Sequence, residues 1–346
     1  MRPNAGFILQ ALLAALFFGA SAPLSKLLLI DVPPVLMAAF LYLGSGTGIS
    51  LVKLSQRLAA NQTEAGIRRS DVRWLAGAIV AGGILAPIVL MISLQSTPAS
   101  TASLLLNFEG VGTTLIALFF FRESISRRAL AAIFVITLAS IFLSTDFASG
   151  FGFSLGALGV ILACVLWGVD NNFTRNISAK DPLTIVAWKG LVAGTFSLLL
   201  GLVLGQQLPS FTSILSILLL GFISYGLSTM LFIYSMRGLG AARTSALYGT
   251  APLAGVLLSF IIFRDPITLL FIFAATLMAA GALLLANEEH AHFHIHMPVV
   301  HEHRHQHDEF HSHDETEITH AHEHAHVRTD HEHGHMPDIH HRHEDK

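Results

Sequence analysis

The chain has 346 residues, of which 53% are hydrophobic and only 12% are charged, and its formal net charge is -3. A soluble domain carries about 25% charged residues to keep its surface hydrated, so this composition, with a mean hydropathy of +0.61, excludes an ordinary soluble protein. We therefore expect an integral membrane protein that is surrounded by a lipid bilayer and has no nucleic-acid partner.

The sequence divides into an apolar body and a polar tail. All 20 histidines lie in the tail, which is also rich in acidic residues, whereas the body is mildly basic. Within the body we expect two halves, 1–149 and 150–286, each forming one structural repeat. The tail, 287–346, has too few apolar residues to form a core, so we predict that it is a disordered cytoplasmic segment.

The composition of the body predicts an all-α fold with ten transmembrane helices. A helix needs about 20 mainly apolar residues to cross a hydrocarbon core of about 30 Å. In chain order, the predicted helices are 7–29, 33–53, 74–94, 99–121, 127–144, 155–174, 183–204, 213–235, 243–263 and 267–286. Asp-Pro and similar turn residues mark several of the breaks between them.

Lysine and arginine collect in the connections after the second and the fourth predicted helices. Connections rich in these residues tend to stay in the cytoplasm, so we place both of them there. An even number of helices then puts both termini, and with them the tail, on the cytoplasmic side of the cell membrane.

An internal repeat relates the two halves. When 98–123 is aligned with 240–265, several residues recur, and the closing pair Arg122-Glu123 matches Arg264-Asp265. Five helices in each half make the halves enter the membrane from opposite sides, which is the inverted-repeat arrangement of many secondary transporters.

Motifs at matching places in the two halves carry a family resemblance. They are the Phe18-Gly and Trp167-Gly turns, the small-residue segments 99–103 and 241–246, Pro252, and the closing pairs Arg122-Glu and Arg264-Asp. Over residues 7–286 the body resembles the ten-helix EamA-type proteins of the drug/metabolite transporter superfamily. The resemblance implies ATP-independent export or exchange of a small molecule. The family usually shows Glu-Pro within the fourth helix, whereas here Glu109 is followed by Gly110.

Glu109 is the strongest candidate for a functional residue in the body. It stands about ten residues into the fourth predicted helix, which places it about 15 Å deep, near the middle of the bilayer. An ionised carboxylate there is costly unless it is paired, so we predict that Glu109 binds and releases a proton during transport. The alternative is a structural acid that is hydrogen-bonded to a neighbouring helix.

Four polar residues interrupt the predicted sixth and seventh helices near their cytoplasmic ends. Asp170 and Lys189 lie at similar depth, roughly 7 to 10 Å, so the two can meet. Such a pair would form a charged gate or a ligand for a zwitterionic substrate, whereas a lone lysine would extend to the interface. Asn171 and Asn172 either add amide contacts to a substrate or cap a broken helix end.

Two further residues complete the candidate substrate site. Asn107 lies two positions before Glu109 on the same predicted helix, so the two side chains point to different faces. Tyr248 lies near a predicted helix end, where tyrosine most often anchors a helix at the membrane interface. A contact with substrate is the alternative role of Tyr248.

Histidines that mostly alternate with other residues distinguish the tail. They are His290, His292, His294, His296, His301, His303, His305, His307, His311, His313, His320, His322, His324, His326, His331, His333, His335, His340, His341 and His343. Alternation sets them on one side of an extended chain, and neutral imidazole favours Zn, Ni, Co and Cu ions. We therefore predict a flexible metal chelator; the alternative is a low-complexity tail without a physiological metal.

These observations favour a secondary transporter and not an enzyme. We expect it to export a small metabolite, amino acid or drug, to need no cofactor, and to act alone or as a homodimer. One alternative is a divalent metal exporter that the tail supplies, although the histidine-free body is a poor shell for a transition metal. Another is a membrane-anchored metal sensor that transports nothing.

Overall fold

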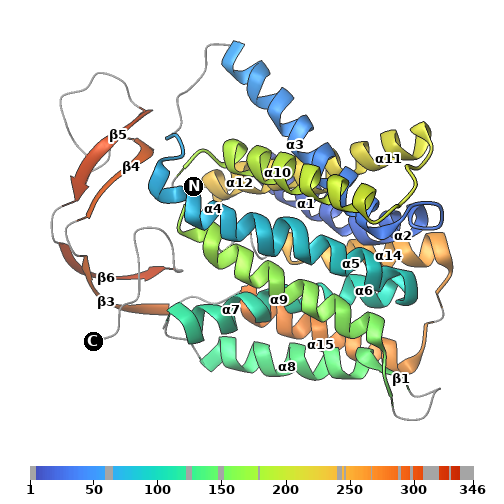
Figure 1. The fold of residues 1–346 in the computed structure, drawn as a ribbon. Helices are drawn as coiled ribbons and strands as arrows, with labels where there is room; N and C mark the ends of the chain where they lie inside the picture. The colour runs from blue at the N-terminus through green and yellow to red at the C-terminus, as the bar shows by residue number, and fades with distance from the viewer. Residues whose placement is uncertain are drawn as a thin grey trace.

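The computed structural model describes residues 5–58, 65–121, 127–146, 152–177, 180–239, 244, 247–265, 267–286, 290–296, 299–306, 319–326 and 329–335. The described part of the body is a bundle of helices, and the described part of the tail lies at the end of the bundle where the N-terminus is found (Figure 1).

The first half of the chain supplies one group of helices. They are α1 (Ala5–Gly19), α2 (Ser21–Leu28), α3 (Pro34–Leu58), the 3-10 helix η1 (Arg69–Asp71), α4 (Val72–Ala78), the π-helix η2 (Ile79–Leu85), α5 (Ala86–Ser96), α6 (Ala99–Leu105), α7 (Phe108–Phe121) and α8 (Arg127–Ser144). Two-residue strands, β1 (Thr145–Asp146) and β2 (Gly152–Phe153), pair where the two halves of the chain meet.

The second half repeats this order. It contains α9 (Leu155–Arg175), α10 (Pro182–Val203), α11 (Phe211–Gly221), the π-helix η3 (Phe222–Leu227), α12 (Ser228–Leu239), α14 (Ala251–Phe263) and α15 (Leu269–Ala286). The same number of residues separates the starts of η2 and η3 as separates the starts of α7 and α14. The two halves therefore carry their irregular helical segments at corresponding places.

Within the described residues, seven helical stretches are long and apolar enough to cross a bilayer. Three shorter apolar helices, Leu130–Leu143, Ala251–Phe263 and Leu269–Gly281, fall where the fifth, ninth and tenth spans were predicted. The ninth predicted span, 243–263, begins largely outside the described residues. The findings support a multi-pass, all-helical membrane body, as the composition predicted.

Helices of the two halves pack mainly against each other. In the described bundle, α3 packs against α10, α11 and η3, α1 packs against α12 and α14, and α8 packs against α15. Small residues allow this close approach: a Cβ added to Gly190 of α10 would lie 2.5 Å from the backbone nitrogen of Gly46 in α3. Because lipid gives helices no hydrophobic reason to associate, such close backbone contact is what holds a membrane bundle together.

Four segments of the tail are described as strands. Strand β3 (His290–His296) pairs antiparallel with β6 (Thr329–His335), and β4 (Val299–Gln306) pairs with β5 (Thr319–His326). A sequence that alternates every second residue matches the pleat of a β-strand. The disorder and the cytoplasmic location expected of the tail stay predictions.

Candidate functional site

A turn interrupts the predicted fourth helix directly before Glu109. Leu106 and Asn107 separate α6 from α7, and the backbone N–H and the side-chain Nδ2 of Asn107 each donate to the carbonyl of Leu104 at 3.1 Å. The predicted fourth span, 99–121, thus consists of two helices, because an amide side chain that binds a nearby carbonyl competes with the helical pattern. Asn107 thus ends α6, and no proline is needed for the break.

Glu109 consequently lies in the first turn of α7. Its backbone N–H donates to the carbonyl of Leu106 at 3.1 Å, within the turn. The free N–H groups at a helix start carry partial positive charge and favour a nearby carboxylate. Half-helices that begin inside the membrane are the usual place for substrate and ion sites in transporters.

An amide from the second half of the chain contacts the Glu109 carboxylate. Nδ2 of Asn171, on α9, donates to Oε1 of Glu109 at 2.9 Å and lies 3.1 Å from the hydroxyl of Thr113. Thr113 in turn donates to the backbone carbonyl of Glu109 at 2.9 Å. Glu109 and Thr113 are half-buried and Asn171 is exposed, so the carboxylate remains accessible from one side.

Asn172, the next residue on α9, makes structural contacts only. Its Nδ2 donates to the backbone carbonyls of Thr113 at 3.0 Å and of Gly168 at 2.8 Å. The side chain is 4% exposed, and Gly168 packs against the backbone of Gly112 in α7. Asn172 therefore fixes α9 against α7 and leaves the contact with Glu109 to its neighbour.

Asp170 and Lys189 meet, as their depths in the sequence predicted. Nζ of Lys189 on α10 donates to Oδ2 of Asp170, and the hydroxyl of Thr174 donates to Oδ1 at 3.0 Å. The Asp170 side chain is 3% exposed and that of Lys189 is 20% exposed. Both carboxylate oxygens of Asp170 are therefore occupied by side chains of the protein.

The π-helix η2 forms the wall beside this ion pair. A π-turn leaves carbonyls without their usual partners, and the carbonyl of Gly82 accepts from the hydroxyl of Tyr42 at 2.6 Å and from Nε1 of Trp167 at 3.0 Å. A Cβ on Gly82 would overlap the carboxylate of Asp170. Gly82 thus permits the close approach of α9 that brings Asp170 to Lys189.

Aromatic rings from both halves pack beside the polar residues. The Phe18 ring centroid lies 5.6 Å from that of Tyr248 and 6.2 Å from that of Tyr225, and Tyr225 lies 5.7 Å from Tyr42. Phe232 packs on the other side of Tyr248, at 4.8 Å. Tyr248 therefore packs against aromatic residues of both halves of the chain.

Thr113 was not among the residues predicted for the site. It lies four residues after Glu109, one helical turn away, and that spacing was a signal that could have found it. Nothing in the sequence predicts the π-helix η3, which carries Tyr225. We name Glu109, Thr113 and Asn171, which are joined by hydrogen bonds, the central site.

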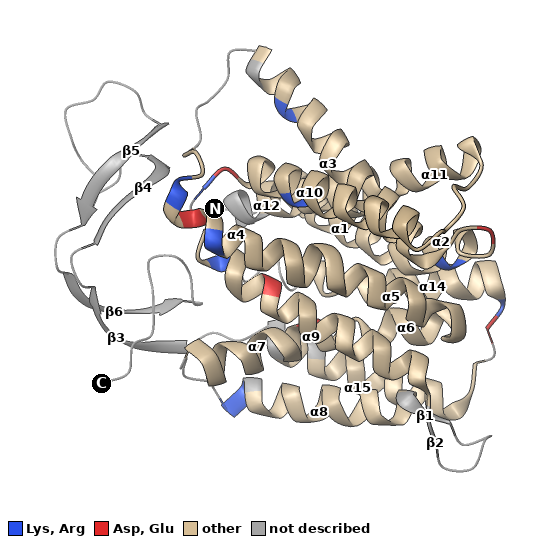
Figure 2. Cartoon of the chain, in the orientation of Figure 1, with Lys and Arg blue, Asp and Glu red and all other residues tan. Residues whose placement is uncertain are grey.

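Charged residues gather near the ends of the bundle (Figure 2). At the end that holds the N-terminus, Nζ of Lys53 contacts Oδ2 of Asp181 at 2.5 Å, and Lys180 lies 3.9 Å from Asp71. Burial opposes ionisation of Asp181, but hydrogen bonds from Lys53 and Thr184 outweigh it and hold the pKa of Asp181 below its usual value. These contacts join the first half of the chain to the second.

A second set of contacts lies at the opposite end of the bundle. Nζ of Lys26 donates to the carbonyls of Leu94 and Thr97 at 2.6 Å each. Oδ2 of Asp265 accepts from the hydroxyl of Ser100 at 2.6 Å and from its backbone N–H at 3.2 Å. Asp265 thereby joins the second half of the chain to the start of α6.

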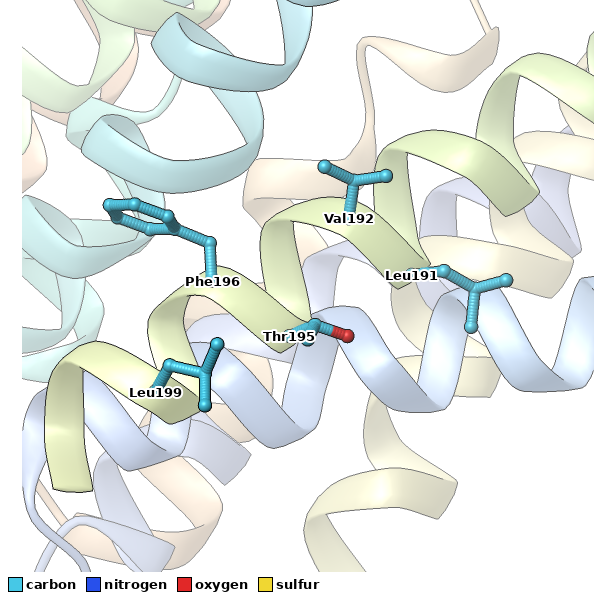
Figure 3. Close-up of a pocket in the computed structure, with 5 residues that line it drawn as sticks. All are labelled: Leu191, Val192, Thr195, Phe196 and Leu199. Carbon is cyan, nitrogen blue, oxygen red and sulfur yellow. The ribbon is translucent and has the colours of Figure 1, made fainter.

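A shallow apolar depression on α10 lies apart from the central site. It is lined by Leu191, Val192, Thr195, Phe196 and Leu199 (Figure 3). An apolar surface of this kind on a transmembrane helix suits contact with lipid. It contains none of the polar residues of the central site.

No group of three or more metal-ligating side chains that could hold an ion is found among the residues that the structure describes. Six of the predicted tail ligands, His307, His311, His313, His340, His341 and His343, lie outside the described residues. Strand pairing places other tail histidines opposite each other in register, such as His290 with His335 and His301 with His324.

Comparison with known proteins decides the family. The model of the EamA-like transporter family matches residues 6–145 and again residues 154–287. The chain belongs to the EamA-like transporter family. The two matches divide this EamA-like protein close to the expected boundary between the halves.

Two individual proteins are similar to this EamA-like chain. One is an uncharacterized transporter of Methanothermobacter thermautotrophicus strain Delta H, which is 28% identical over 301 residues, covering 82% of this chain and 87% of that protein. A crystal structure of a protein aligns with a TM-score of 0.57 at 20% identity, covering 80% of this chain and 94% of that one. The latter likeness concerns the fold alone.

Proposed function

We propose that this protein is a secondary transporter that exports a small metabolite, amino acid or drug and couples this export to protons at Glu109. The observation that carries the proposal is the position of Glu109. It is an acid at the start of a half-helix inside the membrane, and the neutral amide of Asn171, from the other half of the chain, donates to its carboxylate. A carboxylate whose hydrogen-bond partner is a neutral amide can exchange a proton more readily than one held in an ion pair.

The proposal includes ten transmembrane helices arranged as two inverted repeats. Support comes from the two family matches, one in each half, and from the corresponding positions of η2 with η3 and of α7 with α14. With the basic connections in the cytoplasm, both termini are cytoplasmic and the protein spans the cell membrane ten times. It needs no cofactor, and the central site is complete within one chain, whether the protein is a monomer or a homodimer.

Alternating access is the mechanism that we propose. The contacts of Lys53 with Asp181 and of Asp265 with Ser100 lie at opposite ends of the bundle, and each joins the two halves. Opening one end requires breaking the contacts there while those at the other end hold. Rocking of one repeat against the other around a central site is the usual form of such a cycle.

The tail supports a second role, which is binding of Zn, Ni, Co or Cu ions in the cytoplasm. The observation that supports this role is the alternation of histidine with other residues, several of them acidic. The imidazoles can bind a metal ion, and the acidic side chains can neutralise its positive charge. Two alternatives to export of a small organic molecule remain. One is export of a divalent metal ion through the body, and the other is a metal sensor that transports nothing.

Measuring the metabolite and metal contents of cells tests these three hypotheses together. Three strains are compared: one without the protein, one with it, and one with Glu109→Gln. We expect a small organic solute to accumulate in the first and third strains and to be depleted in the second. A change in metal content alone would favour metal export, and no change of either kind would favour a sensor.

A further inference from the structure

The register of the tail strands brings histidines together in pairs. In the outer ribbon, formed by β3 and β6, His292 lies opposite His333, and in the inner ribbon, formed by β4 and β5, His303 lies opposite His322. Each of these pairs is flanked by one further histidine pair on either side, so the two ribbons hold six pairs. Residues spaced by two share one face of a strand, and the three pairs of each ribbon therefore form a row on one face.

This pairing is a property of the register and does not follow from the composition alone. Because successive residues of a strand alternate between the two faces, a slip of one residue would set each paired histidine opposite a different kind of residue. Both ribbons have the alignment that pairs histidine with histidine, and the same alignment continues from the outer ribbon to the inner one. The ribbons thus bring together histidines that lie far apart in the sequence.

A histidine pair of this kind suits a divalent transition-metal ion. Directly opposite residues of an antiparallel pair have Cβ atoms about 4.5 to 5.5 Å apart, a separation at which two imidazoles can bind one ion at about 2 Å each. Neutral imidazole favours Ni²⁺, Cu²⁺ and Zn²⁺. Among the described residues no cluster of three ligands is found, so each ion would take two imidazoles and keep water in its other positions.

The ribbons need a further interaction to be stable. In the described part of the tail each ribbon consists of two strands, and an isolated two-stranded ribbon is at best marginally stable in water. In the inner ribbon Glu302 lies opposite Glu323, and like charges at opposite positions are destabilising. Metal ions bound along a ribbon would join its two strands and add positive charge.

We propose that each histidine pair is a site for one divalent transition-metal ion, and that binding folds the disordered tail into the two ribbons. This inference rests on the proposed metal-binding role of the tail and goes beyond it, because it assigns which histidines share an ion. Two metal–nitrogen bonds form at each ion, and two of its bound waters leave. Each ion also closes a long loop of the chain, and metal ions that close long loops stabilise a fold most.

Counting bound ions tests the pairing. The probe is Zn²⁺, titrated into the full-length protein in lipid nanodiscs with a competing chelator that suppresses binding to single imidazoles. His303→Ala and the double variant His303→Ala/His322→Ala should each bind one ion fewer than wild type, because both changes remove the same site. The matched control His303→Ala/His324→Ala also removes one histidine from each strand, but from two different pairs, so it should bind two ions fewer.

Nitroxide labels test the folding of the tail. Ala291 and Gly334 lie opposite each other in the outer ribbon, and labels there leave every histidine in place. In Ala291→Cys/Gly334→Cys, with Cys164→Ala, Zn²⁺ should broaden the continuous-wave EPR spectrum, because neighbouring strands lie about 5 Å apart, and EDTA should reverse the change. In the control Ala291→Cys/Ala321→Cys, the labels are closer in sequence but are not register partners, so the spectrum should not broaden.

Three results would overturn the inference. They are equal losses of Zn²⁺ in the two double variants, a spectrum of the Ala291/Gly334 pair that Zn²⁺ leaves unchanged, and equal broadening of both labelled pairs, which would indicate collapse without a register. Any of these results together with Zn²⁺ binding would keep the metal-binding role of the tail and reject the paired sites. A full-length protein that binds no Zn²⁺ would reject both, and the proposed transport by the body would stand apart from either outcome.

Discussion

The two acids embedded in the body, Glu109 and Asp170, lie in opposite chemical settings. Asp170 is almost fully buried, and its carboxylate oxygens are taken by Lys189 and Thr174. Glu109 is half-buried, and its carboxylate accepts from the neutral amide of Asn171. The first acid is held in a direct ion pair, while the hydrogen-bond partner of the second is neutral.

This difference suggests a structural role for Asp170 and a role in transport for Glu109. A buried ion pair with complete hydrogen bonding holds two helices at a defined distance, and its loss is expensive. A carboxylate that is not held in an ion pair can accept a proton. A variant of Asp170 should therefore affect mainly stability, and a variant of Glu109 should affect mainly transport.

The largest effect on stability is expected at Asp170. Asp170→Asn leaves the Lys189 ammonium without a counter-charge and should lower the free energy of unfolding by about 3 to 5 kcal/mol. Thermal unfolding in nanodiscs measures this loss. The double variant with Lys189→Met should recover much of it, because no lone charge remains; losses that simply add would show that the two side chains do not interact.

A smaller loss is expected at Gly82. Gly82→Ala inserts a methyl group where the Asp170 carboxylate lies, and overpacking of this kind costs about 1 to 3 kcal/mol. The matched control is Gly66→Ala, because a Cβ at Gly66 meets nothing within 4 Å. A Gly82→Ala variant as stable as the control would contradict the close packing of η2 on Asp170.

The contact of Lys53 with Asp181 should make stability depend on acidity. Because the folded-state pKa of Asp181 lies below its usual value, its contribution is present above about pH 4 and is lost as pH falls through the folded-state pKa. The pair lies near the bundle end, so we expect at most about 1 kcal/mol. Unfolding of wild type and Asp181→Asn, followed from pH 7 to pH 3, should converge at the acidic end.

The tail should matter least to the body. Truncation after Glu289 removes all 20 histidines and should leave insertion and basal transport unchanged while removing any response to cytosolic metal. The isolated segment 290–346 should bind more than one Zn or Ni ion, with affinity that falls as pH drops through about 6.5, where imidazole is protonated. Loss of transport in a correctly inserted truncated protein would instead indicate direct metal delivery.

Much of the body could be predicted from its sequence, because hydrophobic length alone places helices in a membrane. The apolar runs located the described helices to within a few residues, and the depths of Asp170 and Lys189 predicted their contact. These predictions use only position along a regular helix, which the sequence specifies well.

The irregular parts of the site could not be predicted in this way. At the turn, the side chain of Asn107 donates to the carbonyl of Leu104. In η2, the carbonyl of Gly82 accepts from Tyr42 and Trp167, which lie on other helices. Apolar periodicity is the same whether a helix is continuous, broken or widened by one residue per turn. The break that sets Glu109 at a helix start was therefore invisible in the sequence.

Infrared difference spectroscopy of the protein in nanodiscs tests proton exchange at Glu109 most directly. Raising the pH should remove the carbonyl band of one protonated carboxyl group from the wild-type spectrum. The same loss should occur in the control Asp31→Asn, which changes an acid at an exposed position. In Glu109→Gln the band change should be absent. A wild-type spectrum without this loss, or a loss that survives Glu109→Gln, would contradict the assignment of Glu109 as the exchanging acid.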